Sequence, residues 1–341
     1  MRKAVILFNL GGPDKLESVE PFLFNLFKDP AIISIPSIFR YPLAKIISKR
    51  RAPIAKNIYK EIGNKSPILE LTKDQAISLE NSLSKKGEYK CFVVMRCWHP
   101  RASEVIKKVK EYDPGEIILL PLYPQYSAAT SGSSIKEWND LCKRENYKVK
   151  TKTICCYPTE NNFIESHAAL INKTLKSLEN NNFKLIFSAH GLPEKNIKNG
   201  DPYQWQIEQS VKRIMNEIND DTIDYILSYQ SRVGPLKWIG PSTEEVIVKN
   251  SKLNKHLVIV PIAFVSEHSE TLVELDIEYE KLAKKNGCSN YTRIEALGAN
   301  ENFIDGLSDL ILNKDDYKLT DNLCPPKNRC PSNFSKCPCL N

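Results

Sequence analysis

Residues 257–262 read Leu-Val-Ile-Val-Pro-Ile, and an amphipathic stretch from Glu270 to Lys285 follows them. A run this short and continuously apolar is typical of a strand buried in a parallel sheet. The apolar residues of the second stretch recur at spacings of three and four, which predicts a helix. Together they predict one strand–helix unit of an α/β fold.

The same unit recurs along the chain. Further apolar runs are Val5 to Asn9, Phe92 to Arg96, Ile117 to Leu122, Thr153 to Tyr157, Leu185 to Ser188, Tyr225 to Ser228 and Arg293 to Leu297. Helical periodicity covers 103–111, 165–178 and 206–218. Since 341 residues suffice for about two domains, we expect two doubly wound α/β domains.

Composition excludes several classes of protein. With 41% hydrophobic and 26% charged residues, the chain is neither disordered nor fibrous. Its net charge of +7 favours anionic small molecules or a lipid surface, and no Arg-rich stripe indicates nucleic acid. No apolar stretch approaches the ~18 residues of a membrane span, and no secretory or import signal is evident, so we expect a cytoplasmic protein. The glycine motifs of dinucleotide and nucleoside triphosphate sites are missing.

His190 is the first candidate for chemistry. It directly follows the run 185–188, in Ser-Ala-His-Gly-Leu-Pro. Ligands of open α/β sheets collect at the carboxyl ends of strands, which is where this imidazole would lie. A neutral imidazole can accept a proton or bind a metal ion, although a histidine that only bonds a backbone carbonyl is the alternative.

A row of acids follows the run 257–262. Glu270, Glu274 and Glu278 are spaced by four, which places them on one helical face. Like charges at this spacing oppose helix formation, so a bound cation or shared protons would be needed to offset them. The alternative is a solvated acidic face, helped by the basic residues at 281, 284 and 285.

Aromatic and basic residues lie at other predicted strand ends. They are Arg96, Tyr123, Tyr126 and Trp238, a set that suits a large planar anion. Upstream, residues 31–51 form an apolar segment flanked by bases. Such a segment can line an apolar pocket or touch a membrane surface, and an ordinary buried helix is the alternative.

The tail is rich in cysteine. Cys324, Cys330, Cys337 and Cys339 lie in a short Pro-containing terminus. Four sulfurs suit zinc or an iron–sulfur cluster, although their spacing matches no familiar pattern. Free thiols in a disordered tail are the alternative.

Motifs along nearly the whole chain up to residue 310 resemble the ferrochelatase family, the terminal enzymes of haem synthesis. The stretches are Asn9 to Pro13, Lys49 to Pro53, Ser66 to Ile68, Pro121 to Ser127, Thr130 to Ser134, Phe187 to Pro193, Gly200 to Tyr203, Ser228 to Pro235 and Pro261 to Leu272. The resemblance implies two Rossmann-like, chelatase-type domains with a cleft between them. It also implies insertion of Fe²⁺, a substrate, into protoporphyrin IX with release of two protons.

The resemblance also implies roles for particular residues. His190 and Glu270 match the catalytic and metal-binding pair, and His268, Glu274 and Glu278 match a proton or metal relay. Porphyrin contacts are implied for Arg50, Arg51, Arg96, Tyr123, Tyr126, Phe264 and Trp238. The segment from Ile32 to Ile47 resembles an active-site lip that lies on the membrane.

On this basis we expect four parts. They are a first domain over 1–150 with the lip at about 31–51, a second over 151–300 that carries His190 and Glu270, a helix over 301–322 that packs back on the first domain, and the Cys-rich tail over 323–341.

Three departures from the family are visible. Ala128 stands where animal members carry a cysteine ligand of a [2Fe-2S] cluster, so a cluster or zinc would need the tail cysteines. Cys97 and Leu10 replace residues common in relatives. The chain most resembles bacterial members, and we expect protoporphyrin rather than coproporphyrin as substrate. The location would be the cytoplasm, peripheral to the inner face of the plasma membrane.

Other functions stay open at this point. A cobaltochelatase of the same fold, a haem or metal carrier without turnover, and an iron–sulfur sensor are the alternatives. The sequence leaves the oligomeric state open.

Overall fold

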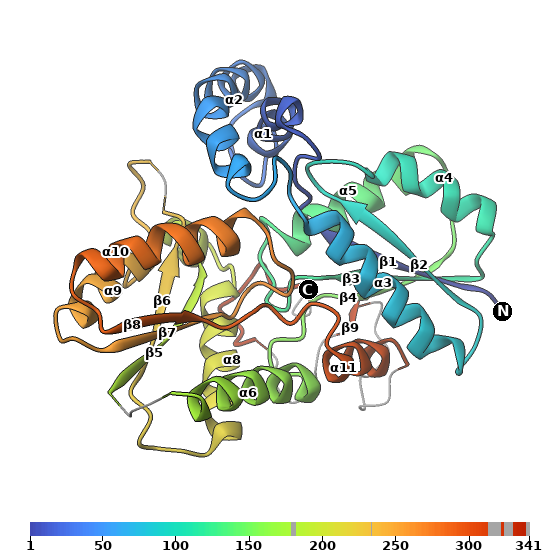
Figure 1. Ribbon diagram of the computed structural model, residues 1–341. Helices are drawn as coiled ribbons and strands as arrows, with labels where there is room; N and C mark the ends of the chain where they lie inside the picture. Colours follow the sequence, from blue (N-terminus) through green and yellow to red (C-terminus); the bar gives the residue numbers. More distant parts are fainter. Residues whose placement is uncertain (179–181, 233, 313–321, 324–329, 339–341) are drawn as a thin grey trace. The chain divides into compact units, whose positions relative to one another are not determined.

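The computed structural model describes residues 1–178, 182–232, 234–312, 322–323 and 330–338 (Figure 1). Contacts divide the chain into two compact units. The first comprises residues 1–156 with described residues between 307 and 327, and the second comprises 157–306 with described residues after 328. The boundary between the two units falls at 156/157. The helix α11 (Glu301–Leu312) runs across the later division at 306/307.

The first unit is built on a parallel sheet with the strand order β2-β1-β3-β4-β9. These strands are β1 (Lys3–Asn9), β2 (Tyr89–Met95), β3 (Glu116–Pro121), β4 (Lys150–Ile154) and β9 (Asn322–Leu323). The inner strand β1 is apolar and buried from Ala4 to Phe8, as expected for a strand covered on both faces. Three helices flank this sheet: α3 (Ile68–Ser84), α4 (Ala102–Tyr112) and α5 (Ser131–Arg144).

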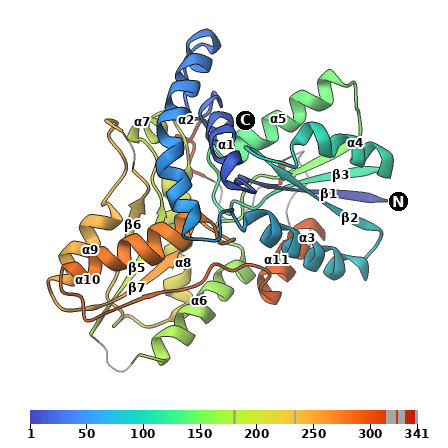
Figure 2. The same ribbon diagram turned by 45° about the horizontal axis from the view of Figure 1, so that its top comes forward.

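A helical pair extends from the first unit. After the short 3₁₀ turn η1 (Leu16–Ser18), α1 (Val19–Phe27) packs along α2 (Ser37–Lys60), as Figure 2 shows. The apolar side chains that α2 does not bury are numerous: Ile38, Phe39, Tyr41, Leu43, Ile46 and Ile54 are all exposed. An ordinary buried helix is therefore wrong for this segment.

The second unit has a parallel sheet with the order β6-β5-β7-β8. Its strands are β5 (Phe183–His190), β6 (Tyr225–Gln230), β7 (His256–Pro261) and β8 (Asn290–Arg293). One face is covered by α9 (Thr243–Ser251), η2 (Glu270–Glu278) and α10 (Tyr279–Lys285), whose apolar side chains join the core of the strands. The helices α6 (Asn161–Lys176) and α8 (Tyr203–Ile218) lie on the other face (Figure 1), and the short α7 (Glu194–Lys198) follows β5.

Two parallel-sheet α/β units confirm the predicted fold class, with three corrections. The strand predicted at 153–157 lies earlier, as β4 (Lys150–Ile154). The predicted strand 293–297 ends at Arg293, because the chain beyond turns away and the Ala296 N–H bonds the Glu267 carboxylate instead of a strand. The predicted helix Glu270 to Lys285 is not one α-helix. Its first part, η2, is a π-helix with i→i+5 hydrogen bonds, a form that is rare and frequent at functional sites. No described helix is long and apolar enough to cross a membrane.

Candidate active site

His190 is the last residue of β5, at the carboxyl end of the second sheet. Its Nδ1 lies 2.6 Å from the Gly191 carbonyl oxygen, which can only accept, so Nδ1 carries the hydrogen. In the neutral ring Nε2 therefore keeps its lone pair. The Tyr203 hydroxyl donates to the His190 carbonyl at 3.0 Å and holds the backbone from the other side. The imidazole is held in place on both sides, and its side chain is 36% exposed.

Gly191 permits a close approach of two neighbours. A Cβ at this position would lie 3.0 Å from the Gln230 carbonyl oxygen and 3.2 Å from the Trp238 ring. Any larger residue would displace them. The indole N–H of Trp238 is buried and has no hydrogen-bond partner in the described part of the chain, so it is a donor still to be satisfied.

Glu270 begins η2 and lies between two imidazoles. Its Oε1 is 3.7 Å from His190 Nε2, and its Oε2 is 3.1 Å from His268 Nε2. The other nitrogen of His268 faces the Ser266 carbonyl at 3.1 Å, and the Phe264 ring lies against the His268 ring with centroids 4.6 Å apart. Both nitrogens of His268 thus face acceptors, which favours the imidazolium form.

The charges of this group determine its protonation. Burial alone would lower the pKa of His268, but the hydrogen bond and charge of Glu270 raise it overall. Burial likewise works to raise the pKa of Glu270, yet the charges of His190 and His268 lower it to about 2. Glu270 is therefore a carboxylate at neutral pH.

The pair of His190 and Glu270 can accept a proton or a metal ion. Two donor atoms bound to one ion at about 2.1 Å lie roughly 3.0 to 3.4 Å apart, so the observed 3.7 Å requires only a small side-chain rotation. The carboxylate also stabilises a positive charge at Nε2 once a proton has arrived there.

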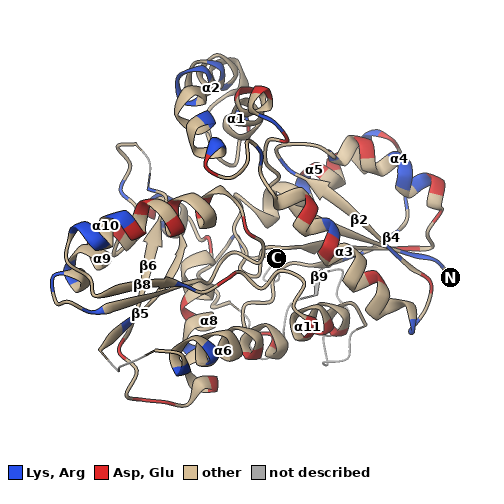
Figure 3. Ribbon diagram, viewed as in Figure 1, with Lys and Arg blue, Asp and Glu red and all other residues tan. Residues whose placement is uncertain are grey.

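Glu274 lies one turn further along η2. Its carboxylate accepts hydrogen bonds from Gln230 Nε2, from the Ser231 N–H and hydroxyl, and from the Tyr279 hydroxyl, at 2.5 to 3.0 Å. Burial and the negative charge of Glu270 raise the pKa of Glu274. Glu278 is exposed at the end of η2, where acidic residues give way to the lysines of α10 (Figure 3).

The remaining porphyrin candidates lie in the first unit. Arg50 and Arg51 are exposed on α2, whereas Tyr126 and the Tyr123 hydroxyl are buried. Arg96 is already engaged: its guanidinium contacts Asp29 at 2.7 Å and Glu137 at 3.2 Å.

Replacing Arg96 by methionine is expected to lower the free energy of unfolding by about 3 kcal/mol, because it leaves the buried Asp29 carboxylate without its counter-charge. Urea denaturation measures the change. Lys136→Met on α5 is the control: its pair with Asp140 is exposed, so we expect no measurable loss. Equal losses would contradict the structural role of Arg96.

The sequence analysis assigned no role to several members of the site, although three of them lie in the motif stretches 200–203 and 228–235. Tyr203, Gln230, Ser231 and Tyr279 are polar partners of the candidate residues. A signal existed for Gln230, since it ends β6 beside His190 at the same edge of the sheet. The other partners depend on tertiary contacts.

The cysteine tail is described only in part. Cys330 and Cys337 are buried, and Gln206 Nε2 contacts Cys330 Sγ at 3.2 Å, while Cys324 and Cys339 lie outside the described residues. No group of three or more potential metal ligands is found among the residues that the structure describes. A cluster or zinc on the tail stays a prediction.

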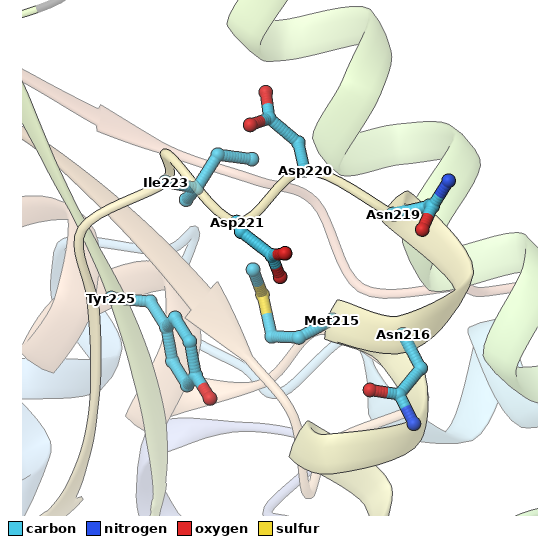
Figure 4. Close-up of a pocket in the computed structure, with 7 residues that line it drawn as sticks. All are labelled: Met215, Asn216, Asn219, Asp220, Asp221, Ile223 and Tyr225. Carbon is cyan, nitrogen blue, oxygen red and sulfur yellow. The ribbon is translucent and has the colours of Figure 1, made fainter.

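A cavity of about 260 Å³ lies elsewhere, near the amino-terminal end of β6 (Figure 4). Met215, Asp221 and Tyr225 are among its lining residues. It includes no residue of the predicted site.

A parallel α/β architecture with an imidazole and a carboxylate at the carboxyl edge of the sheet is compatible with the metal chelatases, and the comparisons with known proteins show that class. A family model described as Ferrochelatase matches residues 2–315. The ferrochelatase of Pelagibacter ubique (strain HTCC1062) is 70% identical and covers 100% of this chain and 99% of its own length. The chain belongs to the ferrochelatase family.

More distant matches agree. The ferrochelatase of Rickettsia felis (strain ATCC VR-1525 / URRWXCal2) is 50% identical over 99% of this chain and 98% of its own length. Among solved structures, SirB from Bacillus subtilis with Fe³⁺ matches with a TM-score of 0.55 at 12% identity, covering 93% of this chain and 96% of that one. This last likeness supports the fold alone.

Proposed function

We infer that this protein is a lyase that inserts Fe²⁺ into protoporphyrin IX, forming protohaem and releasing two protons in the last step of haem synthesis. The observation that carries the inference, within a ferrochelatase family member, is the pair of His190 Nε2 and Glu270 Oε1 at 3.7 Å. A free porphyrin holds two N–H protons that must leave as the dication enters. The pair supplies a base and a counter-charge for that exchange.

We assign His190 as the proton acceptor. Its Nδ1–H is bound to the Gly191 carbonyl, so the incoming proton goes to Nε2, where the Glu270 carboxylate stabilises the resulting imidazolium. Glu270, Glu274 and His268 then form the route by which protons or Fe²⁺ pass along η2, with Glu278 at its exposed end. Binding energy from the rest of the porphyrin can distort the ring and expose its N–H groups.

Porphyrin contacts are proposed for both units. Trp238 and Phe264 offer aromatic faces beside His190 and His268, and the unpartnered Trp238 N–H is a donor for a substrate oxygen. Tyr123, Tyr126, Arg50 and Arg51 are the proposed contacts of the first unit. The charge of Arg96 is already paired with Asp29 and Glu137. We therefore propose that Arg96 stabilises the first unit near these contacts and does not bind the porphyrin itself.

The experiment is anaerobic insertion of Fe²⁺, with Zn²⁺ in parallel, into protoporphyrin IX by the purified protein. Catalytic loss of the free-porphyrin absorbance is expected. Binding in a 1:1 ratio without turnover, under conditions in which another ferrochelatase is active, would identify a carrier instead. Preference for Co²⁺ and a sirohydrochlorin ring would identify a cobaltochelatase.

We propose that α2 places the protein on the inner face of the plasma membrane. Ile38 is 74% exposed and Phe39 65%, and Lys45, Lys49, Arg50 and Arg51 lie on the same helix (Figure 3). Exposed apolar side chains with flanking bases bind anionic lipid surfaces. The proposed location is thus cytoplasmic and peripheral.

The double substitution Ile38→Ser and Phe39→Ser is expected to weaken binding to vesicles of phosphatidylcholine and phosphatidylglycerol by at least about tenfold. The reason is that serine lacks the favourable free energy that an apolar side chain gains on moving from water into lipid. Co-sedimentation measures the change. Ile77→Ser is the control, since Ile77 is 60% exposed but lies on α3. Equal binding by the double variant and the wild type would exclude this face.

A further inference from the structure

A chain of buried hydroxyls leads from the sheet of the second unit to Glu274. Ser188 on β5 and Ser228 on β6 are register partners, and both hydroxyls lie 2.9 Å from Thr243 Oγ1 at the start of α9. Ser188 Oγ also lies 2.7 Å from the amide oxygen of Gln230. These three hydroxyl residues are 0% exposed and Gln230 is 1% exposed, so no solvent competes with the contacts.

The Gln230 amide bridges two parts of η2. Its nitrogen donates to the Glu274 carboxylate at 3.0 Å and to the backbone carbonyl of Glu270 at 3.2 Å. It therefore holds the first residue of the π-helix and the second acid of the row against the end of β6. Both hydrogen bonds come from outside η2, since Gln230 belongs to β6.

The orientation of this amide is determined by its neighbours. A flipped amide would place its oxygen against the carboxylate of Glu274 and the carbonyl of Glu270, both acceptors. In the observed orientation the amide oxygen needs a donor, and Ser188 supplies it. Thr243 can donate to Ser188, and Ser188 then donates to Gln230, while the Ser228 hydroxyl also faces the Phe187 carbonyl at 3.2 Å. Successive hydrogen bonds of this kind strengthen one another.

We propose that Ser188, Thr243 and Gln230 are positioning residues that hold the carboxylate of Glu274 and the start of η2 in the geometry required for metal insertion. The inference rests on the proposed function of Glu270 and Glu274. None of the three residues needs to touch the porphyrin. Their loss should therefore affect the chemical step and not the binding of the porphyrin.

A double-mutant cycle tests the proposal. Ser188→Ala leaves the buried amide oxygen without a donor, and we expect kcat for Zn²⁺ insertion to fall roughly tenfold with an unchanged KM for protoporphyrin. Gln230→Met, which keeps the shape but removes the amide, should lower kcat at least as much. The double variant should be no worse than Gln230→Met, because Ser188 acts through the amide.

Thr243 offers a test in which shape and hydroxyl are separated. Thr243→Val keeps the shape and should lower kcat about threefold, whereas Thr243→Ser keeps the hydroxyl and should restore activity to within about 1.5-fold of the wild type. Thr292→Val is the matched control. It removes a hydroxyl that pairs with His256, the first residue of β7, and should leave kcat unchanged.

Hydrogen exchange of the Gln230 side-chain amide, measured by NMR, gives a readout that does not depend on activity. It should be faster by roughly tenfold in Ser188→Ala than in the wild type. An inactive wild type with this faster exchange would overturn the proposed function but keep the positioning of Gln230. An active wild type with additive losses in the cycle, a raised KM, or equal effects of Val and Ser at position 243 would overturn the positioning role.

Discussion

Replacement of His190 by alanine is expected to lower the rate of metal insertion into protoporphyrin IX by about 10²- to 10⁴-fold, the range for loss of a general base. The His190 imidazole, at the end of β5, places its Nε2 beside the Glu270 carboxylate. Alanine has no group that can accept a proton at this position. Initial rates with Zn²⁺, followed by porphyrin fluorescence, measure the change. Porphyrin binding itself should persist.

His256→Ala is the matched control for this variant. His256 is the first residue of β7, and its Nε2 contacts Thr292 Oγ1 at 2.8 Å. It thus lies at the amino-terminal end of the strand, whereas the candidate site residues lie at the carboxyl ends of the strands. Its removal should change the rate by less than about twofold. If His190→Ala keeps more than about a tenth of the wild-type rate, the assignment of the base is wrong.

Replacement of Glu270 by glutamine is expected to lower the insertion rate by at least about 10²-fold, since the neutral amide cannot stabilise a proton at His190. The same variant should change the pH dependence of stability. The pKa of Glu270 is lowered from 4.5 to about 2, so its stabilising contribution is fully present above pH 4.5 and is lost as the pH falls towards 2. The contribution is at most about 3 kcal/mol.

His268 contributes a dependence of stability on pH that is opposite in sign to that of Glu270. Its pKa is raised above 6.5, so its contribution is present below pH 6.5 and is lost as the pH rises through the higher folded value. Both dependences require the Glu270 charge. Urea unfolding of the metal-free protein between pH 2.5 and 8.5 should therefore give a flatter profile for Glu270→Gln. Parallel profiles for variant and wild type would show that the two imidazoles do not act on this carboxylate.

Periodicity located β1, β3, β5 and β7 well because each of these strands is a short, largely apolar run that is buried on both faces. It failed where a local pattern fitted two structures. The apolar spacing of residues 270–278 predicts an α-helix, but the segment is a π-helix. Gln230 and Ser231, which are distant in the sequence, bond to it, and such contacts are not visible in the local pattern. The strand predicted at 293–297 lies earlier because Arg293 and Ala296 both engage Glu267. Neither partner is visible in a local window.

The candidate site shows the same division. The strand-end rule found His190, and spacing found Glu270 and Glu274, because these signals are local. The pairing of Arg96 with Asp29 depends on segments far apart in the sequence, so an arginine that suits a substrate carboxylate turns out to be bound by the protein's own acids.

The order of synthesis matters for the first unit. The strand β4 ends at Ile154, and its outer neighbour β9 begins only at Asn322. On the ribosome β4 therefore remains an unpaired edge while residues 157–306 of the second unit are made, and an unpaired edge is open to pairing with other chains. Biosynthesis thus leaves a long interval during which a nascent chain can associate with another, and the interval closes only when β9 has been made.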